Sequence, residues 1–167
     1  RNDTTNIKMT FLTDFKRPVF DLINIINKDS DNYLAEILFK MIGANFGANN
    51  DNAPKTRFLT DSLLKKLEIY SDGLILNDGS GLSRRNLVTV SSMVKLLENI
   101  YKSNFYDEFK NSLAIAGVDG TLKKRFHNTL AMSNLFAKTG TLRDVSALAG
   151  YVKSKDGDDI IFSFIFN

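Results

Sequence analysis

Two tripeptides far apart in the chain carry side chains that can do chemistry together. Lys138-Thr139-Gly140 places an ammonium and a hydroxyl beside a residue without a side chain. On a strand, this pair can hold a substrate carboxylate, while the glycine lets substrate backbone lie against the strand. Ser30 and Asn32 flank one residue, and they offer a hydroxyl that can relay a proton and an amide that can bind a carbonyl. Together the tripeptides predict a cleft for a carboxylate-bearing substrate.

Each tripeptide also has a purely structural interpretation. Lys138-Thr139-Gly140 could be an exposed strand end with a turn glycine. Ser30-Asp31-Asn32 could cap the helix that starts near Tyr33, because Ser, Asp and Asn are all favoured N-cap residues. Taken singly, neither tripeptide decides between these interpretations and a functional one.

The elements that must position these residues follow from the apolar periodicity. A strand is expected over 5–13, and helices over 18–27 with Pro18 at the first position, 33–43, 57–67, 90–101 and 105–113. In the third helix Leu59, Leu63, Leu64 and Leu67 are expected to face inward. A loop over 44–54 and a short strand over 74–76 complete this part. Strands over 135–142, 146–152 and 160–166 follow, the last two joined as a hairpin. Ser-Asp-Asn would then lie at a junction between two helices, and Lys-Thr-Gly on a strand.

This order of elements predicts an α+β (mixed α/β) fold in a single domain over 1–167, with a helical cluster followed by antiparallel strands. The expected strand 160–166 is followed by one residue, so we expect the domain to be incomplete at both ends.

Basic and acidic residues are interspersed and the net charge is only +3, which disfavours nucleic acid as a partner. No cysteine and a single histidine exclude Cys-ligated and multi-His metal sites, and no apolar run suits a transmembrane segment.

Four blocks make the pattern specific. They read N-K-D-S-D-N-Y-L-A-E over 27–36, D-G-S-G-L-S-R over 78–84, A-G-V-D-G-T-L over 116–122 and A-K-T-G-T-L over 137–142. In this order they resemble the class C low-molecular-mass penicillin-binding proteins, the D-alanyl-D-alanine carboxypeptidase/endopeptidases of the bacterial cell envelope. The resemblance implies a β-lactamase/transpeptidase-like fold, an acyl-serine mechanism without cofactor or metal, and a periplasmic location. It also implies two ligands: peptidoglycan stem peptides ending in D-Ala-D-Ala, and β-lactam antibiotics.

The resemblance also implies a role for each matched position. Ser30 would relay a proton, Asn32 would bind the substrate amide, and Lys138 and Thr139 would hold the terminal carboxylate. The backbone N–H of Thr141 would form half of an oxyanion hole beside Gly140. A pocket for the peptide's diamino-acid side chain would be lined by Leu82, Arg84, Leu142 and, less typically for the family, Arg143.

The nucleophile of such an enzyme lies in a Ser-x-x-Lys element. No serine precedes Ser30, although the family places the element before Ser-Asp-Asn. Ser62 with Lys65 and Ser92 with Lys95 fit the spacing, but both come later in the chain. We therefore expect the chain to be inactive by itself. The alternatives are a non-catalytic module that binds peptidoglycan stems, or an unrelated soluble domain with chance motifs. His127 is not expected to be a catalytic base, because no Ser-His-Asp spacing in the sequence supports a catalytic triad.

Overall fold

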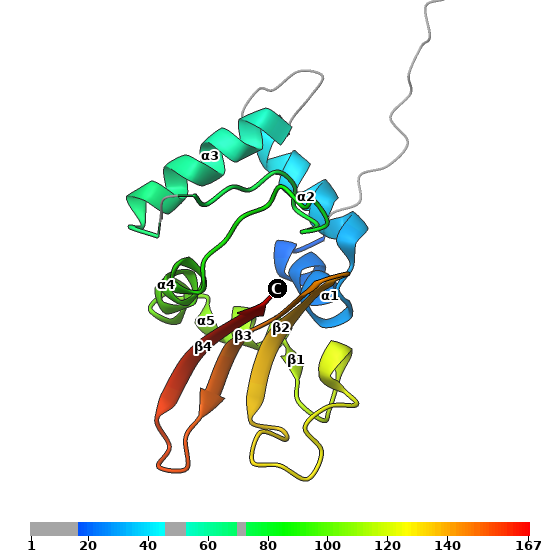
Figure 1. The fold of residues 1–167 in the computed structure, drawn as a ribbon. Coiled ribbons are helices and arrows are strands. Elements are labelled where there is room, and N and C mark those ends of the chain that lie inside the picture. The colour runs from blue at the N-terminus through cyan, green and yellow to red at the C-terminus, as the bar shows by residue number, and fades with distance from the viewer. Residues whose placement is uncertain (1–16, 46–52, 70–72) are drawn as a thin grey trace, which may run out of the picture.

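The computed structural model describes residues 17–45, 53–69 and 73–167. Within them the helices are α1 (Val19–Asp29), α2 (Asn32–Asn45), α3 (Ala53–Lys66), α4 (Val90–Tyr101) and α5 (Tyr106–Ser112), with a short 3-10 helix, η1 (Gly120–Leu122), after them. The strands are β1 (Ala114–Ile115), β2 (Leu135–Leu142), β3 (Val145–Lys153) and β4 (Asp159–Phe166). In Figure 1, α2 and α3 lie at the opposite end of the molecule from the β3–β4 hairpin. The strand expected over 5–13 lies outside the described residues.

Capping residues set the junction at Ser-Asp-Asn. Pro18 lies just before α1, at its N-cap rather than at its first turn. The helix continues to Asp29, two residues further than expected, and Ser30 ends it in the left-handed conformation with φ 58°. The Asp31 carboxylate then accepts a hydrogen bond of 2.8 Å from the Leu34 amide in the first turn of α2. Asp31 therefore does the capping that the tripeptide offered, and the Ser30 hydroxyl remains available for another partner.

The sheet is antiparallel throughout, in the order β1-β2-β3-β4. The three long strands lie within one residue of their expected limits, because their apolar runs are bounded by turns. The sequence did not indicate β1, since two residues are too few to show a period. The expected strand over 74–76 is reduced to one bridge between Ile75 and Leu87. Helices followed by an antiparallel sheet confirm the α+β class.

Both faces of the sheet are packed near its centre. On one face Tyr151 is 1% exposed, packs with Leu97 of α4 and Leu113, and donates a hydrogen bond to the Leu97 carbonyl. The other face packs around a cluster of small and branched residues, which consists of Ala114, Ala116, Leu122, Leu135 and Ala137. One face of the sheet therefore packs against α4, and the other packs against residues 116–122, which include η1.

The expected inward orientation of the α3 leucines holds only in part. Leu64 is 7% exposed, as expected for a core residue. Leu63 is 54% exposed, so the expectation for this residue is wrong. Among the described elements, the main contacts of α3 are with α2 rather than with the sheet. One side of α3 therefore meets solvent where the apolar spacing suggested a core.

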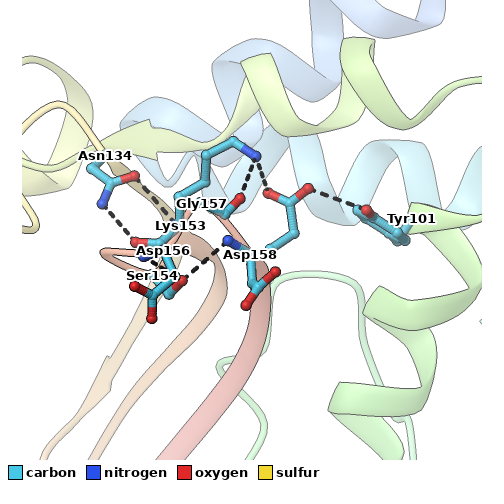
Figure 2. A network of polar contacts seen from close by, with 8 residues as sticks. Tyr101, Asn134, Lys153, Ser154, Asp156, Gly157 and Asp158 are labelled. Atoms are coloured by element: carbon cyan, nitrogen blue, oxygen red, sulfur yellow. Dashed lines mark hydrogen bonds and ion pairs between the residues drawn. The ribbon is translucent and has the colours of Figure 1, made fainter.

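A polar network fastens the β3–β4 hairpin to α4 (Figure 2). Lys153 contacts one Asp159 oxygen at 2.8 Å, and the Tyr101 hydroxyl of α4 donates to the other at 3.1 Å. The hydrogen bond from Lys153 is the main cause that lowers the pKa of Asp159. Lys153 pairs with Asp159 at the hairpin end of β3. Ser146, which pairs with Thr141 of β2, lies near the other end of β3, so the network is far from Thr141 along the strand.

No helix in the described part of the chain is long and apolar enough to cross a membrane.

A glycine substitution tests the packing of the sheet. A Cβ atom at Gly150 would lie 2.0 Å from the Phe136 carbonyl oxygen and 2.7 Å from the Ala137 Cα. We expect Gly150→Ala to lower the free energy of unfolding by about 1 to 3 kcal/mol, measured by urea denaturation. Gly140→Ala is the matched control, because its Cβ would meet only the Ala147 Cβ, at 3.4 Å. Equal losses in the two variants would contradict the register of β2 and β3.

Candidate active site

The tertiary structure joins the two tripeptides directly. The Lys138 ammonium donates a hydrogen bond of 2.7 Å to the Ser30 hydroxyl, although the residues are 108 positions apart. It also donates to the Thr139 carbonyl at 2.8 Å. Ser30 reaches it because the left-handed conformation turns the chain between α1 and α2, and Lys138 reaches it from the middle of β2. A proton donor and acceptor pair is thus assembled from a helix junction and a strand.

Burial lowers the proton affinity of Lys138. Desolvation is the cause that lowers the pKa of Lys138 below its usual 10.5, because a low-dielectric surrounding disfavours the ammonium form. A lysine whose pKa moves toward neutrality gives up its proton more readily at working pH. With the Ser30 hydroxyl in contact, a proton can pass between the serine and the lysine. The electrostatics therefore fit a relay as well as an anion site.

The next residue along β2 has a partner that sequence reasoning missed. The hydroxyls of Thr139 and Thr121 are hydrogen-bonded at 2.9 Å. Thr121 lies in η1, at the exposed surface. The signal was present in the A-G-V-D-G-T-L block, but no position in that block was predicted as a site residue. The structure places this block beside Lys138-Thr139-Gly140.

Gly140 and Thr141 form the exposed end of β2, where they pair with Ala147 and Ser146 of β3. They line an open hollow of about 170 Å³, whose wall includes Phe164 of β4. A second open hollow of about 320 Å³ surrounds the β2–β3 turn and includes Leu142 and Arg143. Neither hollow is lined by Ser30, Asn32 or Lys138. Asn32 is the first residue of α2 and is exposed.

The D-G-S-G-L-S-R block forms a loop that is held on both sides. The Asp78 carboxylate accepts hydrogen bonds from the backbone amides of Gly81 and Ser83, at 2.6 and 2.7 Å. Glu36 of α2 accepts one from the Gly79 amide at 2.9 Å. The loop thereby presents Leu82, which is 54% exposed, to solvent.

Arg84 connects this loop to the strand end. Its guanidinium lies 3.5 Å from the Asp144 carboxylate in the β2–β3 turn, and both side chains are more than half exposed. The structure thus brings Arg84 to the turn that contains Arg143 and follows Leu142. The role of these three residues in binding a peptide side chain stays a prediction. The acidic group that faces Arg84 here is the chain's own Asp144, which sequence reasoning did not identify.

The serines of the two Ser-x-x-Lys matches, Ser62 and Ser92, form hydrogen bonds within or at the start of helices. Ser92 is 4% exposed and forms a capping box with Thr89 at the start of α4. The Ser62 hydroxyl donates a hydrogen bond to the Phe58 carbonyl within α3. His127 is exposed, near Gly117. In the described residues, no three His, Cys, Asp or Glu side chains gather into a candidate metal site.

A comparison with protein families shows which family the chain belongs to. Residues 4–167 match the model of the D-Ala-D-Ala carboxypeptidase 3 (S13) family. The chain belongs to the S13 family. It is 35% identical over 153 residues to the D-alanyl-D-alanine carboxypeptidase DacB of Haemophilus influenzae, covering 90% of this chain and 32% of that protein. It is 40% identical over 146 residues to the D-alanyl-D-alanine carboxypeptidase of an Actinomadura species, covering 84% and 27%.

A solved S13 relative supports the fold as well. The crystal structure of Haemophilus influenzae penicillin-binding protein 4 (dacB), complexed with a β-lactam, superposes with a TM-score of 0.80 at 36% identity, over 87% of this chain and 34% of that one. The expected family and transpeptidase-like fold are therefore confirmed. The chain spans about a third of the length of these relatives.

The pKa of Lys138 predicts a pH dependence of stability. Because this pKa is lowered only in the folded chain, the unfolded chain binds the proton more tightly. The free energy of unfolding should therefore gain a contribution as the pH rises through the lowered pKa toward 10.5. To isolate this contribution, the free energies of unfolding of the wild type and of Lys138→Met are measured by urea denaturation over a pH series, and one is subtracted from the other at each pH. The subtraction is needed because burial raises the pKa of Tyr106 to about 12, and such tyrosines oppose the trend at high pH. Parallel pH curves for the two proteins would contradict the shift.

Proposed function

We propose that this chain is the C-terminal part of a transpeptidase-type domain of a serine-type D-Ala-D-Ala carboxypeptidase/endopeptidase. The observation that carries the proposal is the 2.7 Å hydrogen bond between Lys138 and Ser30. It joins the Lys-Thr-Gly and Ser-Asp-Asn elements in a family whose matching members are named D-alanyl-D-alanine carboxypeptidases. The whole protein would act on peptidoglycan stem peptides in the periplasm, at the cell envelope.

In the proposed mechanism, a serine from a preceding Ser-x-x-Lys element attacks the carbonyl carbon of the D-Ala-D-Ala bond. The bond to the terminal D-alanine nitrogen breaks, and the acyl group stays on the serine. Ser30 and Lys138 pass the proton that the leaving amine needs, which suits a hydroxyl in contact with a lysine of lowered pKa. Water then releases the acyl group. In this scheme β-lactams acylate the same serine.

The remaining residues bind and orient the substrate. Lys138 and the Thr139 hydroxyl hold the terminal carboxylate, with Gly140 allowing close approach of the peptide. Asn32 binds the amide carbonyl. The Thr141 backbone N–H supplies one oxyanion donor, a kind of contact that contributes about 3 to 4 kcal/mol in the transition state. Leu82, Arg84, Leu142 and Arg143 line the region for the stem-peptide side chain, where the Arg84–Asp144 pair limits the free positive charge.

A second candidate function rests on the same strand residues. Lys138 and Thr139 could hold a carboxylate without any attack on it. It would then be a module that binds peptidoglycan stems.

Labelling with a fluorescent penicillin tests the proposal. The 167-residue chain should not be labelled, whereas a longer protein that carries this chain after a Ser-x-x-Lys segment should be. In that protein Ser30→Ala should slow labelling by about 10² to 10⁴, the usual contribution of a proton-transfer group. Ser62→Ala is the control and should label like the wild type. Labelling of the short chain at Ser62 or Ser92 would contradict the proposal, and stem-peptide binding without labelling in either protein would favour the binding module.

A further inference from the structure

Lys28, in the last turn of α1, is anchored to a distant part of the chain. Its ammonium lies 2.5 Å from one Asp119 oxygen and donates to the Leu113 carbonyl at 2.9 Å. The second Asp119 oxygen accepts a hydrogen bond of 2.8 Å from the Ile115 amide. The two charged side chains are 21% and 34% exposed, so water screens the pair less than a fully exposed one. The end of α1 is therefore tied to the segment that joins β1 to η1.

The backbone makes a second contact at the same place. Gly120 follows Asp119 with φ 53°, and a Cβ atom there would lie 2.6 Å from the Lys28 carbonyl oxygen. The turn thus approaches the backbone of α1 as closely as a glycine allows. One residue further, Thr121 bonds to Thr139 of β2. A single turn therefore contacts the chain two residues before Ser30 and one residue after Lys138.

We propose that the Lys28–Asp119 ion pair is a positioning device that sets the distance between Ser30 and Lys138. Both residues act through others: Lys28 holds the helix end from which Ser30 projects, and Asp119 holds the turn that braces β2 through Thr121. A hydrogen bond of 2.7 Å tolerates little displacement of either side. The consequence for the reaction rate rests on the proposed function, whereas the geometric consequence does not.

The first test measures reaction rates. In the longer protein, Asp119→Asn and Lys28→Met should each slow acylation by labelled penicillin by about tenfold to a hundredfold, the usual effect of a small misplacement of catalytic groups. The double variant should be no slower than the slower single variant, because the pair acts as a unit. Lys102→Met is the matched control, since it removes the exposed Lys102–Glu98 pair of α4 and should leave the rate unchanged.

A purely structural role would give a different result. The single variants would then melt at lower temperature but react at the wild-type rate where they are folded. Rates within twofold of the wild type, or additive losses in the double variant, would overturn the proposal. The Asp119→Asn variant keeps a side-chain oxygen as acceptor for the Ile115 amide, which favours its folding.

The second test needs no activity. NMR titration of ¹³C-labelled lysine in the 167-residue chain follows the Lys138 pKa, with the signal assigned by Lys138→Arg. In Asp119→Asn a loosened Ser30 contact would admit water to Lys138, and the smaller desolvation of the ammonium would raise this pKa. We expect a rise, and an unchanged or lower pKa would overturn the proposal. If the wild-type longer protein is not acylated, the proposed function fails, and this titration still tests the positioning.

Discussion

The arrangement depends on one interaction, the contact of a partly buried lysine ammonium with a serine hydroxyl. Desolvation makes the charged form of Lys138 costly, and hydrogen bonds to Ser30 and the Thr139 carbonyl offset part of that cost. To keep these acceptors in place, the chain must hold a helix junction against a strand. The left-handed Ser30, the capping Asp31 and the anchored Lys28 all serve this requirement.

The sheet supplies the frame that this contact needs. At the hairpin end, Tyr101, Lys153 and Asp159 tie β3 and β4 to α4 (Figure 2). At the other end, Gly140 and Thr141 are exposed and border open hollows. The Tyr101–Lys153–Asp159 network therefore lies at the opposite end of β3 from these exposed residues.

The structural role of several residues depends on contacts with residues far away in the sequence. Arg84 meets Asp144, Thr139 meets Thr121, and Lys28 meets Asp119. The four sequence blocks indicated the family of the chain, but they did not show which side chains contact one another. The chain spans about a third of the length of the relatives it matches, and all three of these long-range contacts form within that third.

By itself the sequence determined the α+β class, the three long strands within one residue, the helix junction at Ser-Asp-Asn and the family. Apolar periodicity and capping are local, so a single chain shows them. Only the tertiary structure decided that Asp31 caps α2 while Ser30 contacts Lys138, that Leu63 faces solvent, and that β1 exists. These features depend on which segments pack together, and a two-residue strand or a single hydroxyl contact leaves no periodic trace in the sequence.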